Sequence, residues 1–421
     1  MTDGQSTAPP SAPISAHTIE GPFITAPEKA RSIFIVSLAT ACAPLAAGAM
    51  LFGWRAVAVA VLCIVSCATV ERLYYRVSRV PALLGRSHAY LTGVMLALTL
   101  PPFVPWYIPV VASVFAIVVG KAVFGGVGHF LWQPALVGRL AVAVMFPAML
   151  TAPTGSDTNA WPLLAQEHML FGDVASVRRV DNYRDWKRRA PDGSDGFLVP
   201  RPVQQLRGLT LSATPTYSGI AYARTDLPDT PPAALEDLPP VNDLLYGARP
   251  GGIGETCAII ILVAGLYLVY RNYVKWQLPA AMILTAAAVA AIAPVKLVGP
   301  GNITETHWLP VILEGADVGL VYVSYQILSG PLLLAALLPA METTSRPVTA
   351  GGQTLFGIGC GAGAMLLQLY VDTPIPAYLA VLGMNTFTPA IDALWRPRVL
   401  GTRRWTGRPR RKPTVKPDAD A

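Results

Sequence analysis

Two carboxylates at the edges of long apolar stretches are the first residues of this 421-residue sequence that could do chemistry. Glu342 lies in "METTSRPVT" and Asp392 lies in "TFTPAIDA". Ionisable groups near a hydrocarbon region are costly, so they face the protein interior, a partner or water. Both acids are therefore candidates for a cation path. Asp392 can instead pair with Arg396 at i,i+4, and this simpler alternative stays open.

Glu255 and Thr256 follow a glycine-rich stretch at the start of another apolar run, in "GGIGETC" (251–257). An acid in a first helical turn can cap free N–H groups and suits the helix dipole. A glycine-rich helix entrance also lets a ring or an ion approach the backbone closely. The sequence supports both interpretations.

Hydroxyl groups gather in the polar stretch "LSATPTYSG" (211–219), which interrupts a chain that is otherwise mostly apolar. Pro215 disfavours the helical conformation at Thr214, so this hydroxyl is expected in an extended, exposed segment. From these residues alone, the stretch is expected to be a hydroxyl-rich turn.

Cysteine and histidine offer no metal site and no catalytic group in this sequence. Cys63 and Cys67 are four residues apart, but a zinc site needs further nitrogen or sulfur ligands. The five histidines show no mutual ligand spacing. We therefore predict that the cysteines are packing residues and that the chain holds no metal.

Membrane helices must position these residues. The chain is 53% hydrophobic and only 14% charged, and its apolar runs recur at bilayer-spanning length. The sequence therefore predicts an all-α polytopic membrane protein with about ten transmembrane helices. The predicted spans lie near 32–53, 56–71, 89–103, 105–120, 139–153, 256–270, 278–295, 317–340, 354–371 and 376–393.

Basic residues in the short connections predict the orientation of these helices. Arg72, Lys121, Arg271 and Arg346 fall on one side when the N-terminus is cytoplasmic. The tail from Arg396 onward holds nine Lys and Arg against two Asp, which equals the net charge of +7 of the whole chain. We interpret this tail as a topology signal that contacts anionic membrane lipid, and we predict no nucleic-acid binding.

The predicted spans form two halves of five helices. "LWQPALVG" (131–138) resembles "TFTPAIDA" (386–393) beside helices that cross in opposite directions, which is typical of inverted-topology repeats. Gly and Pro are also common in membrane helices generally. The expected organisation is a disordered cytoplasmic tail (1–30), a first membrane half (31–153), a long irregular extracytoplasmic insertion (154–253), a second half (254–395) and a basic cytoplasmic tail (396–421).

Five ordered motifs carry a resemblance to a known family: "LTGVMLALTLPPFVPWYIPVV", "GKAVFGGVGHFLWQPALVGR", "GGIGETCAIIILVAGLYLVYR", "METTSRPVTAGGQTLFGIGCG" and "MNTFTPAID". From about Arg31 to Arg396 the chain resembles the D subunit of the Rnf electron-transport complex. It also resembles, less closely, the B subunit of the Na⁺-translocating NADH:quinone reductase. The resemblance implies a flavoprotein subunit of a redox-driven ion translocase in the bacterial cytoplasmic (inner) membrane, without turnover when alone.

A covalent flavin is part of what the resemblance implies. In that family an FMN is joined through its phosphate to a Thr hydroxyl in a Ser-Gly-Ala-Thr segment, by a dedicated flavin transferase outside the cytoplasm. The matching residues here are Ala213, Thr214 and Pro215, and Thr214 would carry the FMN. The sequence departs from the family pattern at Leu211 and Ser212, where the family has Ser-Gly, and at Gly208, where the family usually has an acid. The alternatives are an ordinary hydroxyl-rich turn, or a non-covalent flavin whose phosphate pairs with Arg207 or Arg224.

The resemblance also implies partners and leaves alternatives open. The partners would be the other subunits of the complex, and electrons would pass through FMN with coupled Na⁺ or H⁺ translocation. A second flavin (riboflavin) could contact Glu255, Thr256 or polar groups such as Asn385, which could equally satisfy backbone groups in broken helices. The departures at Gly208 and Leu211 would also suit a solute channel or transporter without a cofactor, or a non-redox assembly scaffold.

Overall fold

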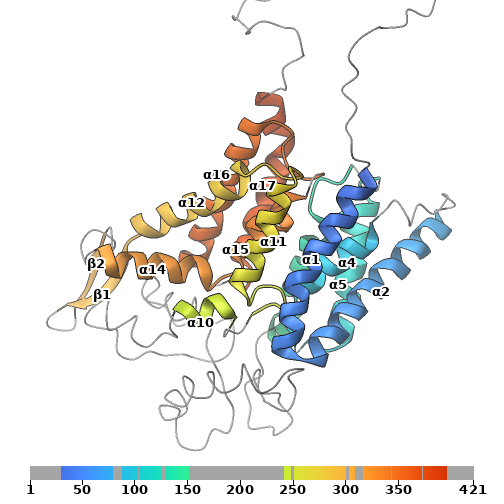
Figure 1. Cartoon of the computed structure of the whole chain (residues 1–421), viewed down its shortest axis with the longest axis horizontal. Coiled ribbons are helices and arrows are strands. Elements are labelled where there is room, and N and C mark those ends of the chain that lie inside the picture. The colour runs from blue at the N-terminus through green and yellow to red at the C-terminus, as the bar shows by residue number, and fades with distance from the viewer. Residues whose placement is uncertain are drawn as a thin grey trace, which may run out of the picture.

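The computed structural model describes most of the two predicted membrane halves. The described residues are 30–78, 88–102, 104–125, 129–150, 241–247, 251–299, 303–308, 316–342, 344–371 and 373–395. Both predicted tails and nearly all of the predicted insertion lie outside these ranges, and Ser212, Ala213 and Thr214 lie outside them too. The described part is almost entirely helical (Figure 1).

The first half consists of two long helices followed by shorter ones. Gly53 has a φ of 71°, which glycine adopts without strain, and it lets the chain reverse between the two long helices. Pro101 and Pro102 follow the third helix and stop it early, because proline cannot continue a helix. The elements are α1 (Ala30–Phe52), α2 (Trp54–Val77), α4 (Ala89–Thr99), α5 (Tyr107–Ile117), the π-helix η1 (Val118–Ala122), α6 (Pro134–Met145) and the 3-10 helix η2 (Pro147–Leu150).

The second half follows the short helix α10 (Val241–Tyr246) and contains a hairpin besides its helices. An antiparallel hairpin of β1 (Val295–Gly299) and β2 (Ile303–His307) pairs Val295 with His307, and the sequence did not predict it. The helices of this half are α11 (Ala258–Tyr270), α12 (Gln277–Ile292), α14 (Ala316–Leu328), α15 (Leu332–Leu337), the 3-10 helix η4 (Pro339–Met341), α16 (Ala350–Tyr370) and α17 (Pro376–Leu394).

Apolar helices of membrane-spanning character are present in both halves. Three described helices are long and apolar enough to cross a membrane: Ser32–Phe52, Trp54–Val77 and Ala350–Tyr370. Several shorter apolar helices accompany them. The predicted single span 317–340 is divided between α14 and α15 at Gly330 and Pro331, where proline interrupts the helix. The structure thus fits a membrane protein, and the number of ten spans stays a prediction.

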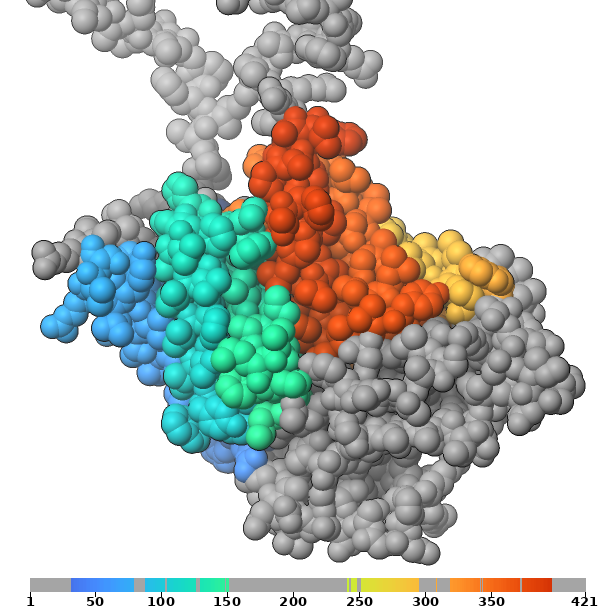
Figure 2. All heavy atoms as spheres, turned by 180° about the vertical axis from the view of Figure 1, so that it is seen from behind, coloured from blue at the N-terminus to red at the C-terminus, as the bar shows by residue number. Residues whose placement is uncertain are grey.

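Equivalent helices make equivalent contacts in the two halves. α4 packs against α1, α2 and α6, and α15 packs in the same way against α11, α12 and α17. Between the halves, α1 contacts α11 and α6 contacts α17, so each helix meets its own counterpart. Gly48 near the end of α1 lies against Ile253, which just precedes α11, so these two helices run in opposite directions. Figure 2 shows α17 (red) directly beside the segment that ends at Leu150 (green).

The predicted match between 131–138 and 386–393 is wrong in its register. Pro134 is the first residue of α6, whereas Pro389 lies inside α17. Pro376 begins α17 and is therefore the structural counterpart of Pro134, because proline suits the first helical turn. A second Pro-Ala pair follows thirteen residues later in both cases, at Pro147 just after α6 and at Pro389 inside α17, which supports the corrected register.

Different parts of the chain lie at the two ends of the helical bundle. The start of α1 and the end of α17 lie at one end, called here the termini end (Figure 1). α10 lies at the opposite end, called the insertion end, because the chain between Leu150 and Val241 leaves and returns there. The rings of Tyr107, at the start of α5, and Phe146, at the end of α6, are 5.8 Å apart and place the end of α6 beside this end.

Candidate functional site

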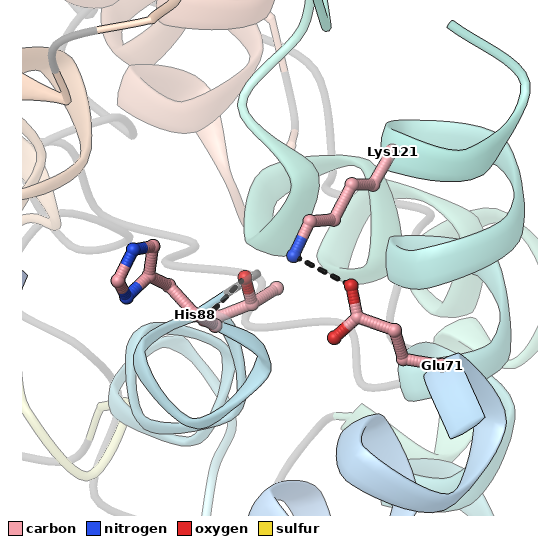
Figure 3. Close-up of polar contacts among 4 residues, drawn as sticks. Glu71, His88 and Lys121 are labelled. Atoms are coloured by element: carbon pink, nitrogen blue, oxygen red, sulfur yellow. Dashed lines mark hydrogen bonds and ion pairs between the residues drawn. The ribbon is translucent and has the colours of Figure 1, made fainter. Parts of the chain in front are cut away.

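A buried ion pair joins α2 to η1 toward the termini end. The Lys121 ammonium lies 2.9 Å from the Glu71 carboxylate, and only 3% of Lys121 and 2% of Glu71 is exposed. Figure 3 shows the two side chains pointing toward each other from their helices. The sequence placed Lys121 in a connection as a topology charge, and it did not single out Glu71. Lys121 is instead buried inside the bundle.

His88 lies close to this ion pair but takes no part in it. Its imidazole points away from Lys121 (Figure 3). The ring stacks on Phe34, with ring centroids 3.5 Å apart. Its backbone oxygen accepts a long hydrogen bond of 3.5 Å from the Thr92 hydroxyl. Burial and the Lys121 charge lower the pKa of His88 to about 4, so the ring is neutral at neutral pH.

Glu342 is held across the boundary between the halves by Gln133. The Gln133 amide nitrogen donates to a Glu342 carboxylate oxygen at 2.7 Å. The amide oxygen of the same side chain accepts from the Leu136 N–H at 2.8 Å and caps α6. Burial raises the pKa of Glu342 to about 7, while the charge of Lys121 and the Gln133 hydrogen bond act in the opposite direction.

Asn385 on α17 completes this group of polar residues. Its amide, oriented to suit its neighbours, donates to the Ser345 carbonyl at 3.3 Å and accepts from the Gln133 N–H at 3.2 Å. The Trp132 indole donates to the Thr386 hydroxyl at 3.0 Å, which adds a second link between the N-terminus of α6 and α17. We call Glu71, Lys121, Gln133, Glu342 and Asn385 the lysine cluster.

Glu255 belongs to a second group nearer the insertion end. One carboxylate oxygen accepts from the Gly252 N–H at 2.9 Å, and the other accepts from the Tyr378 hydroxyl at 2.6 Å. Cys257 is the N-cap residue of α11, and its side chain makes no capping hydrogen bond. The Glu255 carboxylate contacts its own turn and α17 through Gly252 and Tyr378, and capping of α11 by Glu255 stays a prediction. The Thr256 hydroxyl is turned back to the Ile253 carbonyl at 3.5 Å.

The glycine-rich turn before α11 pairs with the extended end of α4. Ile253 N–H donates to the Leu100 carbonyl at 2.9 Å, and Gly254 N–H donates to the Leu98 carbonyl at 2.8 Å. A Cβ on Gly254 would come within 2.7 Å of the Leu98 Cβ, so only glycine fits there. The glycines of this motif serve close backbone contact between the two halves.

Arg139 on α6 donates a hydrogen bond to the same end of α4. Its Nε donates to the Thr99 carbonyl at 3.0 Å, and only 2% of the residue is exposed. A charged residue inside a predicted apolar span was the signal that could have singled it out. We call Thr99, Arg139, Gly252, Glu255 and Tyr378 the tyrosine cluster.

Asp392 belongs to neither cluster. Its carboxylate accepts from the Val348 N–H at 3.1 Å, in the connection that precedes α16. The predicted partner Arg396 lies outside the described residues. The structure thus places Glu342 and Asp392 against opposite ends of the same connection, 342–349, and does not bring them together. Among the described residues, no group of three or more His, Cys, Asp or Glu could hold a metal ion.

Comparison with known proteins assigns the chain to a family. A family model described as NQR2, RnfD, RnfE matches residues 17–401. The chain belongs to this family. The predicted resemblance is therefore confirmed, and it covers both membrane halves and the segment between them.

Three relatives, each named as the D subunit of its complex, illustrate the family. The chain is 30% identical to that of an ion-translocating oxidoreductase complex of Halorhodospira halophila, covering 92% of this chain and 96% of the relative. It is 28% identical to that of a Na⁺-translocating ferredoxin:NAD⁺ oxidoreductase complex of Acetobacterium woodii, over 90% and 93% of the two chains. It is 27% identical to that of a proton-translocating ferredoxin:NAD⁺ oxidoreductase complex of Clostridium ljungdahlii, over 85% and 87%. One relative is named for Na⁺ and one for protons, so similarity does not assign the coupled ion.

Proposed function

We propose that this chain is the D-type membrane subunit of an ion-translocating oxidoreductase complex. The observation that carries this proposal is the family match along residues 17–401, which includes every residue of the two polar clusters. Its partners are the other subunits of that complex, and the chain has no turnover alone because nucleotide and iron–sulfur sites belong to those partners. Electron transport and ion translocation are then properties of the whole assembly.

Within the complex, FMN bound covalently at Thr214 carries electrons through this subunit. Thr214 lies outside the described residues, and its support is the acceptor-like "SATP" together with the hydroxyl that a phosphoester requires. The segment that contains it begins and ends at the insertion end of the bundle. Bound FMN supplies the electron transfer, whereas Ser212 and Ala213 leave room around the acceptor hydroxyl.

The orientation that we propose places the insertion end outside the cytoplasm. Both termini then lie in the cytoplasm of a bacterial cell, residues 154–253 are extracytoplasmic, and the protein is in the cytoplasmic (inner) membrane. One observation supports it, together with the charge rule for short connections. Arg271 and Arg346 lie in neighbouring connections, since the Arg346 guanidinium donates to the Tyr273 carbonyl at 3.0 Å, and short basic connections face the cytoplasm.

Glu342 is the acid that we propose for the ion path. It is linked to both halves through Gln133, and it lies beside Lys121 near the cytoplasmic end of the bundle in the proposed orientation. Glu342→Gln should lower the number of ions moved per electron in the purified complex reconstituted in vesicles. Glu342→Asp keeps the charge and is the matched control. An unchanged ratio in Glu342→Gln would reject this role.

The flavin is tested by fluorescence of the subunit after denaturing gel electrophoresis. A covalently bound flavin survives detergent, so the wild-type band should fluoresce and Thr214→Val should lose both fluorescence and electron transport. Val keeps the β-branched shape, and therefore folding should survive. Thr210→Val and Thr216→Val are the matched controls and should fluoresce like wild type. A non-fluorescent wild-type band from cells that flavinylate other proteins would reject FMN at Thr214.

A further inference from the structure

Lys121 pairs with one carboxylate and lies in the turn that packs on the residues holding a second one. Its ammonium is 2.9 Å from Glu71 on α2. The preceding residue, Gly120, packs directly on the start of α6, where an added Cβ would lie 2.8 Å from the Pro134 Cα. Gln133, the residue before Pro134, holds Glu342 at 2.7 Å. The absence of a side chain at Gly120 therefore brings η1 to the residues that hold Glu342.

The π-helix is what directs Lys121 into the bundle. A π-turn shifts the register of the residues that follow it, and such turns are frequent at functional sites. In η1 all three residues from Gly120 to Ala122 are buried, although a lysine near the end of a membrane helix ordinarily extends to the surface. The local backbone is thus irregular at a position that carries a buried ammonium group.

The groups around Glu342 come from several packed elements. η1 contributes Lys121, which is paired with Glu71 of α2, and the N-cap of α6 contributes the neutral Gln133 amide. α17 contributes the neutral Asn385 amide. His88, before α4, feels the charge of Lys121 and is neutral at neutral pH. A further cation, Arg346, lies in the same connection, but its guanidinium is directed to the Tyr273 carbonyl.

We propose that Lys121 is a positioning residue that sets the charge state of Glu342, and that Glu71 anchors its ammonium for this purpose. This inference rests on the proposed function. Lys121 pairs with Glu71, and its charge also favours the ionised form of Glu342, in an environment where isolated charges are costly. When Glu342 is ionised, both acids attract Lys121. When a proton adds to a Glu342 carboxylate oxygen, Lys121 is left to Glu71, and loss of that proton restores the shared state.

Substitutions of the two members of the ion pair should shift the pH at which Glu342 ionises in opposite directions. Lys121→Met removes the positive charge, so Glu342 should stay protonated to a higher pH. Glu71→Gln removes the competing acid and leaves the ammonium to Glu342, so Glu342 should ionise at a lower pH. A neighbouring charge shifts such a transition by about one pH unit or more, which is about tenfold in proton affinity. Lys121→Arg keeps the charge and should shift it little.

The test is an infrared titration of the purified whole complex, using the protonated-carboxyl band that Glu342→Gln removes. The midpoint of this band should rise in Lys121→Met and fall in Glu71→Gln. The pH profile of ion-coupled electron transport should move in the same two directions. A purely structural role would lower activity in both variants without moving either midpoint, and that result would overturn the inference.

Failure of the inference is distinguishable from failure of the proposed function. If Glu342→Gln translocates ions normally, the ion-path role fails, yet the infrared midpoints still report whether Lys121 controls Glu342. If the Lys121→Met complex does not assemble, the infrared midpoints of Glu71→Gln and Lys121→Arg are compared instead, and this comparison tests the inference. Equal midpoints in these two variants would overturn the inference.

Discussion

The lysine cluster and the tyrosine cluster both bury a carboxylate where the two halves meet, but they hold it differently. In the tyrosine cluster Glu255 uses both carboxylate oxygens, one toward the Gly252 N–H and one toward Tyr378. In the lysine cluster Glu342 accepts a hydrogen bond on one oxygen, from Gln133, and has an ammonium nearby. The first carboxylate is held by a hydrogen bond on each oxygen, whereas the second is held on one oxygen and has a pKa raised to about 7 by burial.

The positions of the two clusters make this contrast informative. Tyr378 and Asn385 are both on α17, seven residues apart, which is about 10 Å along a helix axis. Gln133, which caps α6, and Arg139 on α6 are six residues apart, which is about 9 Å along the axis, and α6 lies against α17. This pair of helices thus contacts a carboxylate held on both oxygens toward the insertion end and a carboxylate with a raised pKa toward the termini end. We infer that the tyrosine cluster holds the halves together and that the lysine cluster serves ion transfer.

The largest expected effect comes from breaking the ion pair on one side only. Lys121→Met leaves the Glu71 carboxylate buried without its cation, which costs about 3 to 5 kcal/mol of folding free energy. The measurement is thermal unfolding of the complex in detergent. The double variant Glu71→Gln with Lys121→Met removes both charges and should recover most of this loss. A double variant as unstable as the single one would show that the charges are not what matters.

The next prediction concerns Glu255, whose carboxylate accepts a hydrogen bond on each oxygen. Tyr378→Phe deletes one hydrogen bond to the Glu255 carboxylate, and a hydrogen bond to a charged group is worth about 1.5 to 3 kcal/mol. Stability should fall by that amount in the same unfolding assay, and the pH profile of electron transport should keep its midpoint. A shifted midpoint would show that the tyrosine cluster also titrates, and the contrast between the clusters would fail.

Local features of both clusters followed from the sequence, whereas their pairings did not. The glycine-rich turn before α11 and the Pro-Ala pairs are local signals that are visible in the sequence, but the match drawn between the Pro-Ala pairs had the wrong register. The partners of Gln133 and Glu255 lie 209 and 123 residues away, and no single sequence specifies such contacts. Lys121 was misplaced because the π-turn that buries it depends on close packing of Gly120 against α6.

A smaller effect on stability is expected when glycine is replaced by alanine, and its sign should differ between a tightly packed position and an open one. Gly254→Ala forces a Cβ to within 2.7 Å of the Leu98 Cβ, and such overpacking costs about 1 to 3 kcal/mol. Gly383→Ala on α17 is the matched control, because an added Cβ meets no described atom within 4 Å there. It should stabilise the helix by up to about 1 kcal/mol, since alanine is the better helix former. Equal unfolding temperatures for the two variants would contradict the tight contact between α4 and the turn before α11.

The smallest expected effect is at Asp392, the acid outside both clusters. Its carboxylate accepts a hydrogen bond from the Val348 N–H at 3.1 Å, and an amide oxygen at the same position can accept it too. Asp392→Asn should therefore change the unfolding free energy by less than about 0.5 kcal/mol, as expected away from buried networks. It should also leave the number of ions moved per electron unchanged.

Asp392→Ala sharpens this last comparison because it removes the acceptor altogether. The Val348 N–H then loses its partner, and the connection that follows Glu342 loses one of its anchors. We expect a larger loss of stability than in Asp392→Asn, again without a change in the ion-to-electron ratio. A lowered ratio in Asp392→Asn, with stability preserved, would instead place Asp392 on the ion path together with Glu342. The connection 342–349 would then present two functional acids to the cytoplasmic end of the bundle in the proposed orientation.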